Sequence, residues 1–146
     1  MRVVFDTNVL ISALITTGKP KELFQHAVKG HVQLVISKNL LQEFIQISKD
    51  HRIRKYISED DVVVFLKIID KTAKITKVKS QFNVVTEDPD DDMVVRTAFD
   101  GKADYIVSGD KHLLSLGEYR GIRILNVDEM MKMLKQEKHR IGIKKE

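Results

Sequence analysis

The first twelve residues, MRVVFDTNVLIS (Met1–Ser12), contain the pattern that decides the fold. A short apolar run, residues 3–5, ends at Asp6, and a second apolar run begins at Val9. This pattern predicts a buried strand that delivers one carboxylate to its C-terminal end and then turns directly into a helix. Sites in open α/β sheets form in the crevice outside the carboxyl ends of the strands, so Asp6 is the first candidate site residue.

The composition is that of one globular domain. The chain has 146 residues, of which 42% are hydrophobic and 32% are charged, and this balance excludes a disordered chain. No apolar run approaches the roughly 20 residues of a membrane span, and the opening residues do not form a signal peptide. The absence of cysteine excludes a disulfide scaffold and a thiolate metal site. We therefore expect a cytoplasmic protein that is not associated with a membrane.

Apolar runs that predict strands alternate with helical patterns along the whole chain. Strands are expected at 2–5, 33–36, 103–107 and 122–125, with a further extended segment within 75–85 that includes Val84 and Val85. Helices are expected at 7–16, 21–29, 38–49, 51–57, 59–74, 93–101, 111–116 and 129–137, with Ser37, Ser58 and Asp128 as N-caps. This alternation predicts an α/β fold in which helices cover both faces of a parallel sheet of four to five strands. We expect one domain over 1–135 and a basic, flexible C-terminal tail over 136–146.

Glu43 is the most informative misfit in the chain. The predicted helix 38–49 has an apolar stripe through Leu40, Phe44 and Ile47, and Glu43 falls on the same face. A carboxylate on an apolar stripe is costly unless it is paired or bound to a cation. Together with Asp6, two further acids stand where such a sheet forms its site, Asp92 at the start of a helix and Asp110 after a late strand. Each of the three aspartates could instead be only a helix N-cap.

Four converging carboxylates predict a divalent cation, because their repulsion would otherwise require protonation. Oxygen ligands without cysteine or histidine pairs favour one or two ions of Mg²⁺ or Mn²⁺ over Zn²⁺. Magnesium also prefers phosphate oxygens, which points to a phosphodiester substrate. We expect Thr7, Asn8 and Ser108 to orient the acids. His112, beside Asp110, is either a substrate contact or, in the interpretation that we favour, a surface residue.

Several blocks of the chain carry a family resemblance: Asp6-Thr7-Asn8, Glu43, DPDDDM at 88–93 and YIVSGDKHLL at 105–114. In this order they resemble the PIN-domain nucleases, most closely the VapC-like toxin components of toxin–antitoxin systems. The resemblance extends to about Leu134. It implies a Rossmann-like α/β/α sandwich, Mg²⁺- or Mn²⁺-dependent endoribonuclease activity, homodimers or higher oligomers, and inhibition by a small antitoxin protein. By position, the family's acids fall on Asp6, Glu43, Asp92 and Asp110, with Asp90 and Asp91 as possible additional acids.

We therefore predict a metal-dependent endoribonuclease, a hydrolase acting on RNA as the toxin of a type II pair. Two alternatives stay open: an RNA-maturation or quality-control nuclease without an antitoxin, and a catalytically silent module that binds RNA or a partner. We expect the apolar helix at 62–69 to contribute to an oligomer or antitoxin contact. The basic segments 49–55 and 71–79 are expected to contact the RNA backbone, although each could be only a solvated helix face. In the first segment the candidate residues are Lys49, Arg52, Arg54 and Lys55.

Overall fold

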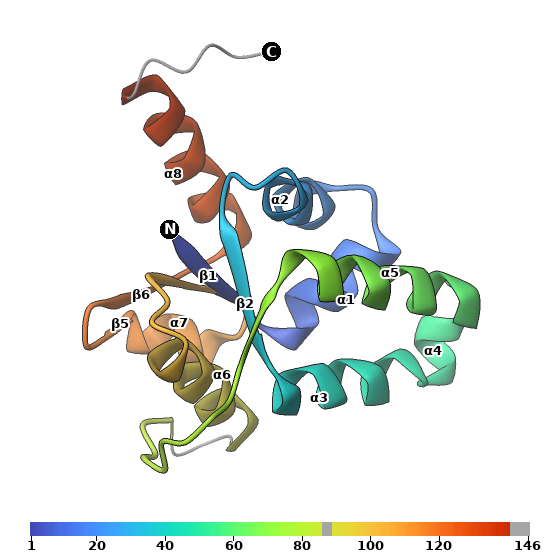
Figure 1. Ribbon diagram of the computed structural model, residues 1–146, viewed down its shortest axis with the longest axis horizontal. Coiled ribbons are helices and arrows are strands. Elements are labelled where there is room, and N and C mark those ends of the chain that lie inside the picture. The colour runs from blue at the N-terminus through green and yellow to red at the C-terminus, as the bar shows by residue number, and fades with distance from the viewer. Residues whose placement is uncertain (86–88, 141–146) are drawn as a thin grey trace.

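The protein folds around one sheet covered by helices on both faces, as Figure 1 shows. The structure, a computed structural model, describes residues 1–85 and 89–140, the last three of these by their backbone alone. Residues 86–88, which include the first residue of the DPDDDM block, and residues 141–146 of the predicted tail lie outside the described residues. Among the described helices, none is long and apolar enough to cross a membrane.

The sheet has the order β3-β2-β1-β4-β6-β5. Its strands are β1 (Arg2–Phe5), β2 (Gln33–Ser37), β3 (Lys74–Thr76), β4 (Tyr105–Val107), β5 (Glu118–Tyr119) and β6 (Ile122–Leu125). The first five strands of this order are parallel, whereas β5 pairs with β6 antiparallel. The predicted α/β class and parallel sheet are confirmed. Strand β5, at the edge of the sheet, was not predicted, because its two residues are too few to show an alternating pattern.

The helices occupy most of the remaining described chain. They are α1 (Thr7–Ile15), α2 (Lys19–Val28), α3 (Lys38–Ser48), α4 (His51–Arg54), α5 (Glu59–Thr72), α6 (Pro89–Asp100), α7 (Lys111–Leu116) and α8 (Val127–Arg140). In Figure 1, α1 to α5 lie on one side of the sheet and α6 lies on the other. Gly101 lets α6 end close against the sheet, since a Cβ there would lie 2.5 Å from Val35 Cγ1 and 2.9 Å from Thr76 Oγ1.

The helix starts follow local capping chemistry. The Ser37 hydroxyl accepts a hydrogen bond from Leu40 N, and Ser58 forms a reciprocal capping box with Asp61, so both predicted caps are confirmed. The predicted cap Asp128 was wrong, because α8 begins at Val127, two residues before the expected start at 129. Asn126 caps it instead: its Oδ1 accepts a hydrogen bond from Glu129 N, and its own N donates to Glu129 Oε1.

The segment before α6 differs most from the prediction. Val84 and Val85 are not part of a strand, because both of their backbone N–H groups donate to Asp92 Oδ1, at 2.7 Å each, instead of to a neighbouring strand. Arg96 holds the same segment through a 2.7 Å hydrogen bond from Nε to the carbonyl oxygen of Phe82. Helix α6 itself starts at Pro89, earlier than the expected 93. Proline is favoured in the first turn, and the acids that follow it complement the helix dipole.

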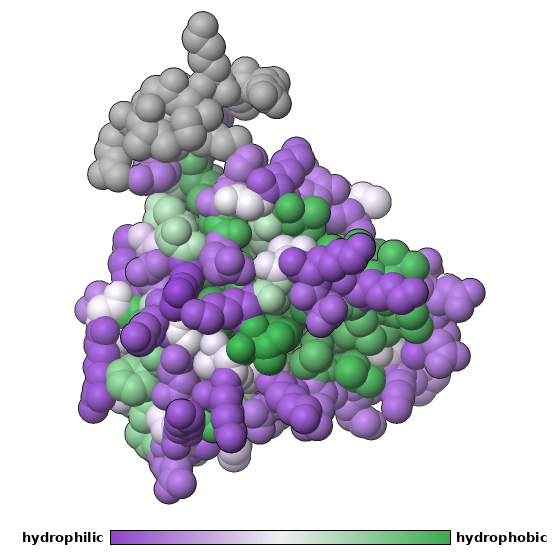
Figure 2. All heavy atoms as spheres, in the orientation of Figure 1, coloured by the Kyte–Doolittle hydropathy of each residue, from purple (hydrophilic) through white to green (hydrophobic). Residues whose placement is uncertain are grey.

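Helix α5 is not buried all round. Phe65 stacks on Phe24 of α2 and Phe44 of α3, with ring centroids 4.6 and 5.5 Å apart. By contrast, Val63 and Val64 are 44% and 56% exposed. In Figure 2 a hydrophobic area lies over α5 and between α5 and α3. One face of α5 therefore belongs to the core, and its other face presents apolar side chains to the surface.

Candidate metal centre at the sheet switch point

The chain changes direction across the sheet between β1 and β4. From β1 it continues to β2 on one side, and from β4 it continues to β6 on the other. The backbone N–H of Asp6, just after β1, donates a 2.9 Å hydrogen bond to Val107 O at the end of β4. The carboxyl ends of these two strands thus meet at a topological switch point, where open α/β sheets form their binding crevice.

Ser108 connects the two acids that follow these strands. Its buried hydroxyl donates a 2.7 Å hydrogen bond to Asp6 Oδ2 and accepts a 2.9 Å hydrogen bond from the backbone N–H of Asp110. Asp6 occupies the N-cap position of α1, yet its side chain makes no capping hydrogen bond to this helix. The backbone N–H groups of Asn8 and Thr7 still favour the charged form of Asp6. Asp6 is nevertheless more than a helix cap, because its carboxyl group accepts the hydrogen bond from Ser108.

The environment of Asp6 disfavours its charged form. Burial is the main cause that raises the pKa of the Asp6 carboxyl above its ordinary value, the Ser108 hydrogen bond opposes this rise, and the negative charge of Asp110 adds to it. A buried carboxylate near a second carboxylate is stabilised in its ionised form by a cation. The fold therefore places Asp6 where a positive ion would lower the cost of its burial.

Asp110 and Asp91 meet directly. Asp91, in the first turn of α6, is only 5% exposed, and its side chain hydrogen-bonds Asp110. Oxygen atoms of these two acids and a ring nitrogen of His112 lie within 4.8 Å of one another, which is close enough for one ion to bind all three. Two carboxyl groups in hydrogen-bond contact share either a proton or a cation. This group is the candidate metal centre.

Asp110 also caps helix α7. Its Oδ1 accepts hydrogen bonds from the backbone N–H groups of His112 and Leu113, at 2.8 and 3.2 Å. Burial, the largest single influence, raises the pKa of Asp110, but the hydrogen bonds from Leu113, His112 and Asp91 together with the charge of His112 lower it below its ordinary value. The capping role expected as an alternative is thus present. It coexists with membership of the acidic group, because the carboxyl group has two oxygens.

The three aspartates of α6 have different surroundings. Asp92, the residue assigned by position, is buried, and its Oδ1 accepts hydrogen bonds from Val84 N and Val85 N. Asp90 is exposed. Successive residues of a helix point about 100° apart, and in this fold Asp91 is the one that contacts Asp110. The metal-binding role of Asp92 stays a prediction. Asp92 instead holds the segment before its own helix.

Glu43 lies at the edge of the apolar stripe of α3. Leu40 and Phe44 are fully buried, whereas Glu43 is half-buried. Among the described residues, the compact group that could hold one ion consists of Asp91, Asp110 and His112 and does not include Glu43, Asp6 or Asp92. The metal-binding role of Glu43 stays a prediction. His112, which sequence spacing could not select, belongs to this group because its partner Asp91 comes from a distant element.

Thr7 and Asn8 follow Asp6 with opposite exposure. Thr7 is 1% exposed, and its Oγ1 has no hydrogen-bond partner within the described part of the chain. Buried hydroxyls are normally satisfied, so an ordered water or bound ligand is expected there. Asn8 is exposed and lines a cavity of about 660 Å³ that opens beside Ser108. The structure thus keeps both residues next to Asp6, and their predicted role in orienting the acids stays a prediction.

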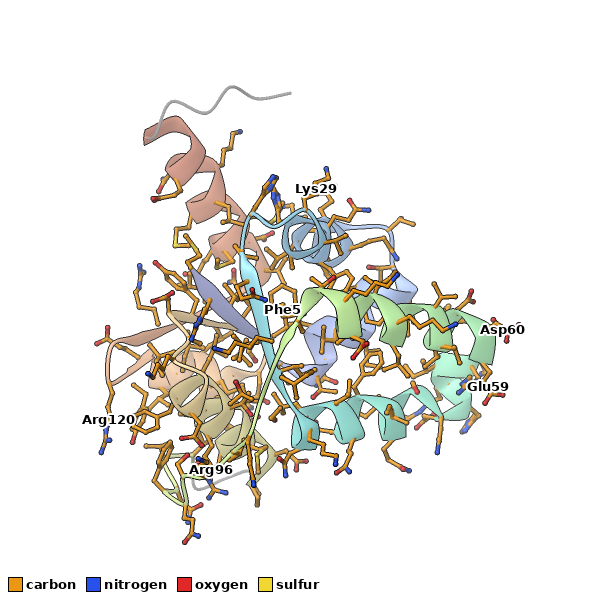
Figure 3. All side chains as sticks on the ribbon, viewed as in Figure 1. Phe5, Lys29, Glu59, Asp60, Arg96 and Arg120 are labelled. Carbon is orange, nitrogen blue, oxygen red and sulfur yellow. The ribbon has the colours of Figure 1, made fainter. Side chains whose placement is uncertain are left out.

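The acidic turn at 59–61 does not belong to this site. Figure 3 shows Glu59 and Asp60 at the far end of α5, away from Arg96 on α6. The basic corner at 49–55, which contains α4, lies at the same distant end in Figure 1. Within it, Arg52 forms a bidentate ion pair with Asp50 and Arg54 Nε donates to Ser48 O. Two of the four predicted RNA-contacting cations are therefore already engaged by this corner.

A second basic group surrounds a hollow of about 440 Å³ at the C-terminal end of α6. Its cations come from three separate segments: Arg2, Lys74 with Lys77 and Lys79, and Lys102. Asp100 also lines the hollow, but its Oδ2 accepts hydrogen bonds from Lys79 N, Ser80 N and Ser80 Oγ. Part of this group falls in the predicted basic segment 71–79. Arg2 and Lys102 could not be assigned to it before the fold was known.

Comparisons with known proteins agree with this architecture. A family model described as PIN domain matches residues 2–112. The chain is 32% identical over 130 residues to an uncharacterized protein of Methanocaldococcus jannaschii, a match that covers 87% of this chain and 83% of that protein. The crystal structure of VapBC2 from Rickettsia felis, bound to a DNA fragment from their promoter, matches with a TM-score of 0.60 and 13% identity. This match covers 86% of this chain and 98% of the other, and at such identity it supports the fold alone.

Proposed function

The chain belongs to the PIN-domain family, whose members are generally nucleases, and on this basis we propose that it is a Mg²⁺- or Mn²⁺-dependent endoribonuclease. The observation that carries the proposal is the group of ligand atoms from Asp91, Asp110 and His112, which lie within 4.8 Å of one another at the switch point of the sheet. Two acids from different elements are held together there, with Asp6 and Ser108 directly behind them.

The donor set fits a hard divalent cation. Asp91 and Asp110 offer carboxylate oxygens, and His112 offers a ring nitrogen within the same 4.8 Å group. Such oxygen ligands suit Mg²⁺ or Mn²⁺, and a single imidazole is compatible with Mn²⁺. A bound ion would activate water for attack on phosphorus and stabilise the charge of the leaving oxygen. We propose Asp91 and Asp110 as its main ligands, with Asp6 and Glu43 adding negative charge to the same crevice.

The neighbouring residues have positioning roles in this proposal. Ser108 fixes the Asp6 carboxyl group through its side chain and the Asp110 backbone through its acceptor oxygen. His112 Nδ1 lies 3.9 Å from Asp110 Oδ1 and its side chain is 40% exposed, so a protonated ring could also contact a phosphate oxygen. Asp92 acts at a distance from the chemistry, because it holds residues 84–85 against α6.

The charge distribution favours a nucleic-acid strand as the substrate, and we propose that this strand is RNA. The protein carries a net charge of +4, and the basic hollow lies at the opposite end of α6 from Asp91. Nine residues of helix separate Asp91 from Asp100, which corresponds to about 14 Å. An extended strand could therefore contact the hollow through its phosphates while one of its phosphodiesters lies at the acids.

The test is RNA cleavage by the purified protein with Mg²⁺, with Mn²⁺ and with a chelator. We expect cleavage only with metal, and a loss of about 100-fold or more in Asp91→Asn and Asp110→Asn. Asp60→Asn, at the far end of α5, is the matched control and should retain activity. Cleavage that survives the chelator, or that survives both site substitutions in folded protein, would contradict the proposal.

We further propose that the protein is a toxin whose partner is a small antitoxin. The matched Rickettsia felis structure is that of VapBC2 bound to promoter DNA. This describes that protein, and it suggests the hypothesis of an antitoxin for this chain. Expression of the wild-type chain should arrest growth, whereas Asp91→Asn should not, and a small protein encoded beside it should relieve the arrest and co-purify. Normal growth despite active cleavage would favour the alternative of a maturation or quality-control nuclease.

A further inference from the structure

We propose that the cavity beside Ser108 binds one nucleobase of the RNA strand, next to the phosphodiester at the acids. This inference rests on the proposed function and adds a base-selecting subsite to it. The cavity has a volume of about 660 Å³ and lies between the starts of α1 and α2 and the loops that follow β4 and β6. This volume is within the range of about 300–1,000 Å³ that is usual for small-molecule sites.

Ser108 and Gly109, which line the cavity, directly precede Asp110 of the acidic group in the chain. Ser108 lines the cavity and also donates its hydroxyl hydrogen to Asp6 Oδ2. Gly109 lines it next in sequence, and a Cβ at this position would meet no atom within 4 Å, so the wall there is open. Asp110, with its contact to Asp91, follows directly. A nucleotide whose phosphate lies at the acids would therefore have its base or its neighbour's base within reach of the cavity.

The walls have the chemistry of a nucleobase site. Val9, Pro20 and Val127 supply apolar surface for the flat faces of a base. Asn8 and Asn126 add two amide side chains, which can donate to and accept from base edges. The Asn126 amide is already oriented, since its Oδ1 accepts a 2.8 Å hydrogen bond from Glu129 N. Apolar walls with a few oriented polar groups are typical of sites that select a small ring.

The charges at the rim favour a neutral ring over a phosphate. Lys19 and Asp128 both line the cavity, and they form an ion pair with a distance of 2.9 Å between Nζ and Oδ1. Within the described part of the chain, Lys19 is the one lysine that lines the cavity, and it is paired with a carboxylate of the same wall. An anion entering here would have to compete with Asp128, whereas an uncharged base would not. We infer that the phosphate lies at the acids and the base lies in the cavity.

Binding can be tested without any cleavage by NMR titration of the four nucleoside 5′-monophosphates into the protein in the presence of Mg²⁺. We expect at least one of them to shift the amide resonances of Asn8, Val9, Gly109 and Val127. Ribose 5-phosphate, which lacks the base, should shift these resonances far less. Equal shifts with ribose 5-phosphate, or no shift at these residues with any of the four nucleotides, would overturn the inference.

Two variants narrow the cavity from different walls. Val127→Trp fills the cavity from the start of α8, and Ser12→Leu fills it from α1. If one of these variants does not fold, the other still tests the inference. Each should weaken nucleotide binding at least tenfold, whereas Val28→Trp, at the exposed C-terminal end of α2, should leave it unchanged. In RNA of mixed sequence, the same two variants should relax any base preference next to the cleaved bond.

The two proposals fail in different ways. Nucleotide binding in the cavity without metal-dependent cleavage would contradict the proposed nuclease and keep the base site. Metal-dependent cleavage with an unchanged base preference in both cavity variants would keep the nuclease and overturn the base site.

Discussion

The hydroxyl of Ser108 donates a 2.7 Å hydrogen bond to the carboxylate oxygen Oδ2 of Asp6, and both side chains are buried. The two residues are 102 positions apart in sequence and end two adjacent parallel strands. The same oxygen of Ser108 accepts a hydrogen bond from Asp110 N. One hydroxyl therefore sets the positions of two acids of the candidate site.

Replacing Ser108 with alanine should destabilise the protein and disturb the site together. Loss of the hydroxyl leaves the buried Asp6 carboxylate without this donor, which should lower the free energy of unfolding by about 1–3 kcal/mol. It should also reduce RNA cleavage, because the Asp6 carboxyl group would no longer be held. Urea denaturation and cleavage assays measure the two effects. Ser115→Ala, an exposed serine of α7, is the matched control, and equal behaviour of the two variants would contradict this role for Ser108.

Asp91 and Asp92 should separate by function. Because Asp91 contacts Asp110, Asp91→Asn should abolish both RNA cleavage and the stabilisation of the protein by Mn²⁺. It should lower the free energy of unfolding only a little. Asp92→Ala should instead lower the free energy of unfolding by about 1–3 kcal/mol, since it leaves the N–H groups of Val84 and Val85 without their acceptor. Asp92→Asn keeps an acceptor oxygen and should be milder. Thermal unfolding with and without Mn²⁺ distinguishes them. Loss of Mn²⁺ stabilisation in Asp92→Asn but not in Asp91→Asn would contradict this division of roles and support Asp92, the residue assigned by position.

Asp100 should contribute stability that depends on pH. Burial, the largest single influence, raises its pKa, but the hydrogen bonds from Ser80 and Lys79 and the charge of Lys79 outweigh it, and the pKa lies below the ordinary value. Stabilisation is then complete above the unfolded-state pKa of about 3.9 and is lost as the pH falls through the lower folded-state pKa. Asp100→Asn should therefore be less stable than wild type at pH 7 and approach it near pH 3. Asp70→Asn, at an exposed position, is the matched control. A stability difference between Asp100→Asn and wild type that stays constant at all pH values would contradict the prediction.

The basic hollow should govern the salt dependence of RNA binding. We expect the triple variant Lys74→Gln, Lys77→Gln and Lys102→Gln to bind single-stranded RNA more weakly and to lower the slope of log K against log salt by about 2. A control that removes the same charge, Lys29→Gln with Lys49→Gln and Lys55→Gln, contains the two exposed lysines of the predicted corner 49–55. Fluorescence anisotropy with catalytically inactive protein gives both slopes. A larger change in the control would favour that corner as the RNA contact.

The exposed face of α5 should mediate an oligomer or antitoxin contact. Val64 is 56% exposed within an apolar run, so Val64→Asp should lower the mass in solution or abolish antitoxin binding without unfolding the protein. Val64→Thr keeps the shape without a charge and should have a small effect. Phe65 is unsuitable for this test because it stacks on Phe24 and Phe44. Light scattering after size-exclusion chromatography measures the mass, and unchanged mass and antitoxin binding in Val64→Asp would exclude this face.

Local chemistry made much of the fold predictable from the sequence. The alternation of apolar runs gave the parallel strands and the helices between them, and the hydroxyl caps at Ser37 and Ser58 marked two helix starts. The positions of Asp6 and Asp110 after strand runs also followed from the pattern alone. These features depend on residues within one or two turns of each other, so their physical causes are visible in the linear sequence.

Contacts between distant segments were decided only by the tertiary structure. The sequence presents Asp90, Asp91 and Asp92 as equivalent acids, but the rotation of α6 directs Asp91 to Asp110 and leaves Asp92 to hold residues 84 and 85. His112 joined the acidic group, and Arg2 and Lys102 joined the basic hollow, for the same reason. A side chain's direction around a helix, and the elements it then meets, depend on how that helix packs on the sheet. Composition and spacing therefore determined which acidic and basic side chains are available to this protein, and the packing of the helices on the sheet determined which of these side chains come together.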